Sequence, residues 1–187
     1  MVLSNQINPG MILKISGKLF RVESSVKVTV PKGTPFVKTK LRDLSNDSII
    51  EKSFKLNQQV DDVALKERPL EFLYLEGNNY LFLDTTNLEQ VLIPASIVGD
   101  NVNFLKEGVL LNAHYYGEEV YGIDLPQFLE LMVSKLEGDQ EEEEESAANV
   151  ERMAILETGA KVKVPGFIEI GDIIKVDTKT CDYIQRV

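Results

Sequence analysis

The chain has 187 residues, of which 43% are hydrophobic, so its length accommodates one or two average domains or three very small ones. Its net charge of −10 argues against general nucleic-acid binding by the whole molecule, but residues 1–63 carry ten Lys and Arg against six Asp and Glu, which indicates a polar partner at that end. With Cys181 as the single cysteine, no secretory signal and no long apolar run, we expect no intramolecular disulfide, no membrane span and a location in the reducing cytoplasm.

The first predicted unit, residues 1–63, consists of short strands joined by tight turns. Alternating apolar residues predict strands over residues 11–15, 18–24 and 48–56. No helical periodicity interrupts them. Together with the two strands of the hairpin described next, they predict a small barrel or an SH3-like sheet.

The most distinctive segment of this unit is a basic hairpin, residues 26–44. Alternation predicts an outgoing strand over residues 26–30 and a returning strand over residues 37–41, and the tip between them is Pro31, Lys32, Gly33, Thr34 and Pro35. The prolines fix φ at two points and Gly33 permits a left-handed turn, so a stiff tip directs Lys32 into solvent. Because a strand of about seven residues spans roughly 20 Å, we expect Lys32 to reach into a cleft that the protein body cannot enter.

The charges of the hairpin are all of one sign. Besides Lys32 they belong to Lys27, Lys38, Lys40 and Arg42, with no acid from residue 26 to residue 42. Basic side chains on a strand pair are suited to contact phosphates without reading a sequence. The alternative interpretation is an ordinary exposed turn with a solvated basic face, and the pattern by itself leaves both open.

Residues 64–126 form the second predicted unit. Two strands flank Gly77-Asn78, which is a strong hairpin signal, and a third strand precedes a short helix over residues 97–105. A second hairpin turns at Gly117. This order of strands, with one short helix between the third and the fourth, is typical of a small Greek-key barrel of the OB type.

Residues 127–187 form the third predicted unit, which again shows strand patterns, at residues 128–135, 160–164, 173–177 and 183–187. Between the first two of these strands lies an acidic segment, residues 139–149, with five consecutive glutamates. Repulsion between like charges predicts a solvated loop that protrudes between two strands. The unit resembles the second one in size and in the spacing of its predicted strands, although no long-period repeat is detectable.

Motifs for catalysis or cofactor binding are absent from the sequence. His114 is the only histidine, so a histidine-rich metal site is excluded, and we interpret it as structural or surface-exposed. Cys181 has no neighbouring histidine or thiol and is interpreted as a structural thiol. There is no Walker loop and no dinucleotide fingerprint. We therefore expect no metal, no cofactor and no enzyme activity; an esterase or glycosidase is an alternative supported only by the number of carboxylates.

Two segments resemble the bacterial translation elongation factor P family. The hairpin VPKGTPFVKTKLRDL, residues 30–44, resembles the family's first-domain loop with its lone tip lysine. The tail, residues 156–187, resembles the family signature, which is matched here at Gly159, Val164, Pro165, Ile170, Gly171, Asp172, Val176, Asp177, Thr178, Tyr183 and Arg186. The resemblance implies three β-barrels in an L-shaped, tRNA-like arrangement, with a KOW/SH3-like barrel followed by two OB folds. This agrees with the all-β class and with the three units described above.

The resemblance further implies a non-enzymatic factor that binds the 70S ribosome between the P and E sites, beside the peptidyl-tRNA or the initiator tRNA. Such a factor promotes peptide bond formation at consecutive prolines. We expect a monomer whose Lys32 points toward the peptidyl-transferase centre and positions the CCA end. In many family members this lysine is modified, often by β-lysylation through a ligase that resembles lysyl-tRNA synthetase.

Further site residues follow from the same resemblance. Phosphates of tRNA and rRNA are expected to contact Lys27, Lys38, Lys40 and Arg42, and further RNA contacts are expected at Tyr183 and Arg186. The chain departs from the family pattern at the tip, where Pro31 replaces the usual glycine and Thr34-Pro35 differs. This leaves open which enzyme, if any, modifies Lys32. The acidic run stands where many members have a Gly-rich segment near mRNA, so that contact is not expected here.

Two other functions remain open at this stage. An elongation factor P-like paralogue with a different ribosomal role has the same shape, and the retained Lys32 argues against it. A general single-stranded nucleic-acid binder built on OB barrels needs aromatic side chains stacked along a basic groove. The candidate aromatics lie in acidic surroundings at alternating strand positions and are expected in the core: Phe72, Tyr74, Tyr80 and Phe82.

Overall fold

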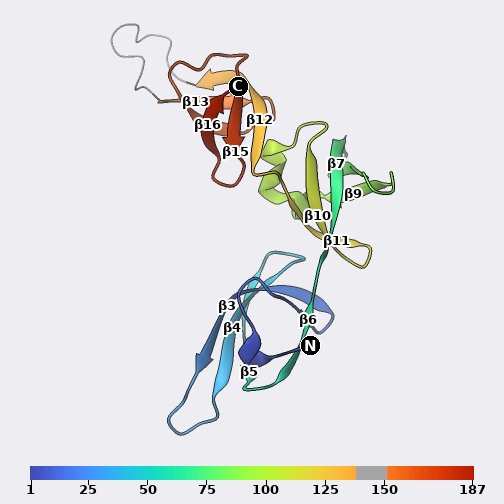
Figure 1. Cartoon of the computed structure of the whole chain (residues 1–187), viewed down its shortest axis with the longest axis vertical. Coiled ribbons are helices and arrows are strands. Elements are labelled where there is room, and N and C mark those ends of the chain that lie inside the picture. The colour runs from blue at the N-terminus through green and yellow to red at the C-terminus, as the bar shows by residue number, and fades with distance from the viewer. Residues whose placement is uncertain (138–150) are drawn as a thin grey trace. The chain divides into compact units, whose positions relative to one another are not determined.

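The regular secondary structure of the described residues consists almost entirely of β-strands. The computed structural model describes residues 1–137 and 151–187, whose strands form three sheets (Figure 1). The helical segments among these residues are short: η1 (Ser4–Gln6), α1 (Ala95–Val98) and η2 (Gly99–Phe104). No helix in this part of the chain has the length and apolar character of a bilayer-spanning segment. The predicted all-β class is confirmed.

The described residues divide into two compact units. One contains residues 1–68 and 113–122, and the other contains residues 69–112 and 123–187. The acidic segment of residues 139–149, predicted as a protruding loop, lies outside the described residues.

The first unit is built around a six-stranded sheet with the order β1-β6-β2-β3-β4-β5. Its strands are β1 (Val2–Leu3), β2 (Ile12–Ile15), β3 (Lys18–Val28), β4 (Phe36–Asp43), β5 (Ile49–Lys55) and β6 (Gln59–Val63). One hydrophobic core fills it, made of Ile7, Leu13, Phe20, Val22, Leu41, Phe54 and Val60. The buried Ser4 ties η1 to the end of β5, because its Oγ donates to the Lys55 carbonyl at 2.7 Å.

Strand β3 joins two segments that the sequence pattern predicts as separate strands. The pairing of β3 with β4 is irregular between Val22 and Ser24, as in a β-bulge. Before the bulge Val22 faces the core, and beyond it the inward face passes to Ser25, which pairs with the buried Thr39. A bulge inserts one residue and so shifts the alternation of side chains. Because the bulge changes which residues face inward, the alternation of side chains predicted two separate strands in place of the one continuous β3.

Two five-stranded sheets follow, with the orders β11-β10-β7-β8-β9 and β14-β13-β12-β15-β16. The strands of the former are β7 (Lys66–Glu76), β8 (Asn79–Asp84), β9 (Gln90–Pro94), β10 (Leu110–Tyr116) and β11 (Glu119–Asp124). Those of the latter are β12 (Phe128–Glu137), β13 (Glu151–Leu156), β14 (Lys161–Pro165), β15 (Ile173–Asp177) and β16 (Asp182–Arg186). The predicted helix at residues 97–105 coincides with α1 and η2.

The same five-residue turn closes one hairpin in each of the three sheets. A buried aspartate opens each turn: Asp43, Asp84 and Asp177. In each case its carboxylate accepts the backbone N–H two residues later, from Ser45, Thr86 and Lys179. Four residues after the aspartate, the backbone enters the left-handed region at Asp47, Leu88 and Cys181. The turns therefore share a hydrogen-bonding pattern that their differing sequences did not reveal.

Within the second unit, two residues that follow α1 contact the third sheet: Phe104 and Lys106. Phe104, at the end of η2, is part of the hydrophobic core of the third sheet. Lys106 Nζ donates to Glu157 Oε1 at 2.9 Å, and the same oxygen accepts the Met132 N–H at 2.9 Å. Burial disfavours the charge of Glu157, but these two contacts outweigh it and lower the pKa of its carboxyl below the ordinary value.

The left-handed turn residue Leu88 provides a first stability test. Its φ is 60° and its side chain is 73% exposed, so a bulky residue occupies a strained conformation without burial to offset the strain. We expect Leu88→Gly to raise the free energy of unfolding by about 1 kcal/mol in urea denaturation. Leu92→Gly, at an exposed position within β9, is the control and should destabilise. An equal decrease in the free energy of unfolding in both variants would contradict the assignment of backbone strain to Leu88.

A second test concerns the pH dependence of the Glu157 contacts. Since its pKa is lowered on folding, the contribution of Glu157 to stability is present above the ordinary glutamate pKa and is lost as pH falls through the folded value. Glu157→Gln keeps an acceptor for the Met132 N–H but loses the charge. We expect it to lower stability by about 0.5–1 kcal/mol at neutral pH, and we expect this loss to disappear as pH falls below the ordinary glutamate pKa and through the folded value, measured by thermal unfolding. A loss that does not change with pH would refute this assignment.

Candidate nucleic-acid interface

The basic hairpin and β5 together form three neighbouring strands, β3-β4-β5, at one edge of the six-stranded sheet. Strand β4 pairs with β3 as far as the pair Val28–Phe36, and with β5 along its whole length, from Phe36–Lys55 to Arg42–Ile49. Beneath it, Val37 and Phe54 are a buried cross-strand pair. Only residues 29–35 therefore extend beyond the sheet, which is less than the strand-length arm expected from the sequence. The support from β5 makes the base of the tip rigid.

The tip is a tight turn that presents Lys32 to solvent. Gly33 N donates to the Val30 carbonyl at 3.2 Å, with Pro31 and Lys32 between them. Lys32 is exposed, and its side chain has no hydrogen bond or ion pair with any described residue. Gly33 is not in the left-handed region, so the predicted role of this glycine is wrong. A Cβ at this position would lie 3.3 Å from Val30 Cβ and Cγ1, a tight contact that the exposed Val30 side chain would have to relieve.

The register distributes the predicted phosphate-binding residues over both faces of the sheet. Residues paired directly across strands share a face. Lys38 pairs with Val26, and Lys40 with Ser24, on the outward face, whereas Lys27 pairs with the buried Val37 and lies on the opposite face. The four predicted phosphate-binding residues, Lys27, Lys38, Lys40 and Arg42, therefore do not form one continuous row.

Lys38 has an acidic partner on β5. Its Nζ lies 2.8 Å from Glu51 Oε2, and both side chains are about half exposed, 49% and 51%. Glu51 also pairs in register with Lys40. The hydrogen bond and charge of Lys38, followed by the more distant charge of Lys40, lower the pKa of the Glu51 carboxyl.

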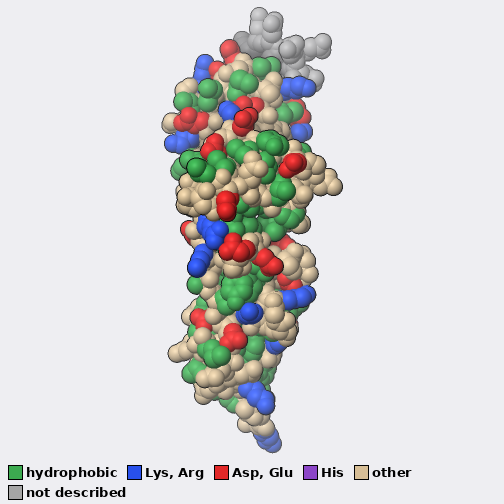
Figure 2. All heavy atoms as spheres, turned by 90° about the vertical axis from the view of Figure 1, so that its right-hand side faces the viewer, with side chains coloured by type: hydrophobic (Ala, Val, Ile, Leu, Met, Phe, Trp, Pro, Cys, Tyr) green, Lys and Arg blue, Asp and Glu red, His purple; other side chains and the backbone are tan. Residues whose placement is uncertain are grey.

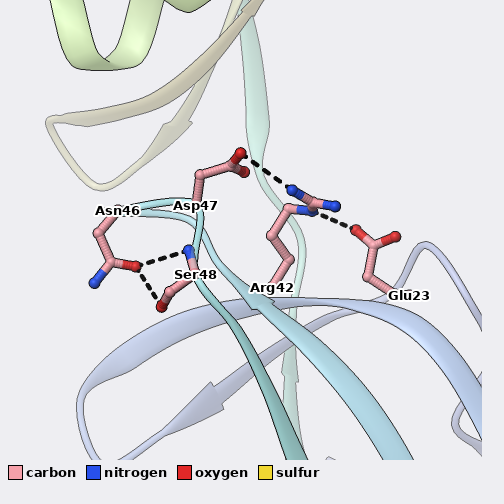
Figure 3. A network of polar contacts seen from close by, with 5 residues as sticks. All are labelled: Glu23, Arg42, Asn46, Asp47 and Ser48. Atoms are coloured by element: carbon pink, nitrogen blue, oxygen red, sulfur yellow. Dashed lines mark hydrogen bonds and ion pairs between the residues drawn. The ribbon is translucent and has the colours of Figure 1, made fainter.

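Arg42 is held by two carboxylates at the base of the hairpin (Figure 3). Its Nε donates to Glu23 Oε1 at 2.7 Å and its Nη1 to Asp47 Oδ2 at 3.1 Å. These bonds, that of Glu23 first, raise the pKa of the guanidinium. The turn that carries Asp47 is itself ordered by Asn46, whose Oδ1 accepts the Ser48 N–H and hydroxyl. Arg42 is therefore engaged within the protein, and the structure gives it a local structural role.

Two further basic residues of this surface were not predicted from the sequence. Lys55 pairs with Phe36 next to the tip and shares the outward face of Lys38 and Lys40, while Lys52 pairs with Thr39 on the opposite face. In Figure 2, basic side chains lie over the lower end of the first unit, which in Figure 1 carries the loop between β3 and β4. Both residues would have been predicted if the expected strand over residues 48–56 had been paired with the returning strand of the hairpin, residues 37–41.

The two C-terminal residues predicted to contact RNA make contacts inside the third sheet. Tyr183 packs against the hydrophobic core around Leu131 and Ile174. Arg186 Nη2 lies 2.9 Å from Asp172 Oδ1, whose side chain is only 12% exposed. These contacts account for both residues without a nucleic-acid partner.

The other residues considered in the sequence analysis lie in the strands and turns of the second and third sheets. Phe72 and Phe82 are buried with ring centroids 5.4 Å apart, as predicted, but Tyr74 is 55% exposed, so its prediction as a core residue was wrong. His114 is largely buried, with Nδ1 3.9 Å from Glu67 Oε1. Cys181 is exposed in a turn. Among residues 1–137 and 151–187, no group of three His, Cys, Asp or Glu side chains is arranged as a metal site.

Comparisons with known proteins cover the whole chain. Three family models match: "Elongation factor P (EF-P) KOW-like domain" at residues 3–60, "Elongation factor P (EF-P) OB domain" at residues 65–123 and "Elongation factor P, C-terminal" at residues 129–186. The chain is 65% identical to "Elongation factor P 1" of Protochlamydia amoebophila (strain UWE25) and 47% identical to that of Chlamydia pneumoniae, over the full length of both chains in each case. These matches support the predicted KOW-like and OB domains.

One solved structure resembles part of the fold. "Eukaryotic translation initiation factor 5A from Methanococcus jannaschii" aligns with a TM-score of 0.55 at 13% identity, covering 67% of this chain and 90% of that one. At this identity the likeness concerns the fold alone.

The Lys38–Glu51 pair is testable by titration. Because a neighbouring cation stabilises the charged carboxylate, removing it should raise the pKa of Glu51 toward the ordinary glutamate value. We expect a clear rise in Lys38→Met and a smaller one in Lys40→Met, followed by NMR of the side-chain carboxyl carbon. Equal pKa values in Lys38→Met and the wild type would show that the pair is not populated in solution.

Proposed function

Because this chain belongs to the elongation factor P family and is a translation elongation factor, we propose that it binds the ribosome beside the P-site tRNA and promotes peptide bond formation at consecutive prolines. The observation that carries this proposal is the position of Lys32. It lies exposed in the loop between β3 and β4, and its side chain has no intramolecular partner in the described part of the chain. Its amine is therefore available to a partner outside the protein.

In this proposal the factor accelerates the reaction by positioning. A proline nitrogen is a poor nucleophile because its ring constrains the approach to the carbonyl. Holding the CCA end of the peptidyl-tRNA in a reactive orientation lowers the entropic part of the barrier without any proton transfer by the factor. Lys32 contributes a charge-assisted contact to the nucleic acid, and the reaction itself remains with the ribosome. The chain accordingly has no catalytic residue of its own in this mechanism.

Backbone phosphates of tRNA and rRNA are proposed partners of the basic residues around the tip. Lys40 and Lys55 on the outward face, and Lys27 on the opposite face, have side chains without an ion pair among the described residues. Lys38 joins them when it exchanges Glu51 for a phosphate, whereas Arg42 supports the hairpin from its base. Such contacts orient the protein without reading sequence.

Modification of Lys32 is part of the proposal. An exposed side chain in a short turn is accessible to a ligase, and Pro31 next to it presents a tip that differs from the glycine usual in the family. We further propose a monomer in the cytoplasm, with three domains at residues 1–63, 64–126 and 127–187. An elongation factor P-like paralogue with another ribosomal task is the second candidate, favoured by this departure at Pro31.

The central test is the rate of polyproline synthesis. In a reconstituted translation system we expect Lys32→Ala to slow synthesis across consecutive prolines by about tenfold, which corresponds to about 1.4 kcal/mol of activation free energy. Templates without consecutive prolines should be unaffected. Lys179→Ala, an exposed lysine of the third sheet region, is the matched control. The intact mass of the protein from its native host defines which form of Lys32 is assayed. Full activity of Lys32→Ala would overturn the proposed function.

A further inference from the structure

Acids of the first unit pair with two of the basic residues on β4, and Lys40, between those two, has no ion pair with a described residue. At the base, Arg42 is flanked by Glu23 and Asp47. Farther along, Lys38 is paired with Glu51. Nearer the tip, Lys27, Lys55 and Lys32 have no ion-paired side chain among the described residues.

We propose that Glu51 is an internal competitor for RNA phosphates, which occupies Lys38 and weakens the attraction of Lys40 on the outward face of the sheet. In this way it limits the affinity of the factor for the nucleic acid it contacts. The inference rests on the proposed function, because it concerns the surface that surrounds Lys32. It adds a residue of opposite charge to a site otherwise described by its lysines alone.

The register places this carboxylate in the middle of the basic face. Glu51 lies directly opposite Lys40, and its Oε2 is 2.8 Å from Lys38 Nζ. A phosphate that approaches either lysine therefore meets a negative charge at close range. The three side chains together carry one positive charge, where the two lysines alone would carry two.

The pair is exposed enough to exchange. Both side chains are about half accessible, and exposed ion pairs contribute little to stability, so Lys38 is able to leave Glu51 for a phosphate. Because Lys38 must leave Glu51 before it contacts a phosphate, RNA binding is weaker and more reversible than it would be with an unpaired Lys38. Because most differences in affinity between related complexes arise from the dissociation rate, the expected consequence is faster release after each round.

The first experiment measures affinity and its salt dependence in the full-length protein. Binding of a fluorescein-labelled RNA hairpin is followed by anisotropy at several KCl concentrations. We expect Glu51→Gln to bind roughly fivefold more tightly at low salt and to steepen the log–log salt dependence by roughly 0.7–0.9, the value for one further phosphate contact. Adding Lys38→Gln should cancel most of the gain. Equal melting temperatures exclude a folding effect.

The matched control is Glu76→Gln. Glu76 is the exposed last residue of β7, its side chain makes no hydrogen bond or ion pair with a described residue, and its substitution changes the net charge by the same amount. An affinity and salt dependence of Glu51→Gln equal to those of the wild type would overturn the inference. An equal gain in Glu76→Gln would also overturn it, because net charge alone would then explain the effect.

The second experiment separates this inference from the proposed function. Dissociation is measured from 70S ribosomes that carry a P-site tRNA, and Glu51→Gln is expected to dissociate several-fold more slowly than the wild type. Tighter RNA binding with unchanged ribosomal dissociation would refute the ribosomal role of Glu51. Failure of the proposed function appears separately, as full polyproline synthesis by Lys32→Ala, whatever the salt dependence of Glu51→Gln.

Discussion

The site depends on the pairing of β5 with β4 along the full length of β4. A hairpin of two strands alone is marginally stable in water, whereas a third strand over a buried face makes it rigid. The buried pair Val37–Phe54 supplies that face, and Ser4 holds the end of β5 from the other side. Rigidity at the base leaves only residues 29–35 free, so the direction of Lys32 is set by the sheet as well as by its flanking prolines.

Charge on this sheet is controlled by neighbouring strands. Within the hairpin, residues 26–42 contain no acid, yet Glu51 on β5 and Asp47 in the following turn reach Lys38 and Arg42. The cations without an ion pair among the described residues include Lys40 and three residues nearer the tip, Lys27, Lys32 and Lys55. The hairpin is basic in sequence, and acids that come close to it only in the folded structure reduce the positive charge of its surface.

A recurrent turn links the three sheets despite their different sequences. The segments that begin at Asp43, Asp84 and Asp177 share a buried carboxylate that accepts a backbone N–H two residues later, and a left-handed residue at the fifth position. Asp and Asn side chains stabilise turns through such local bonds. Because only the first residue is common to all three turns, the repeat is visible in the hydrogen bonds and torsion angles and not in the amino-acid sequence.

The sequence by itself determined the all-β class, the positions of most strands and the exposed tip lysine, because alternation, turn residues and charge act over a few neighbouring positions. The tertiary structure alone decided which strand supports the hairpin, that Lys55 shares the outward face, and that Gly33 does not adopt a positive φ. It also decided that Arg42 and Arg186 are bound to acids of their own chain. Strand register and ion pairing join residues far apart in the chain, and a one-residue bulge such as that between Val22 and Ser24 changes which side chains share a face.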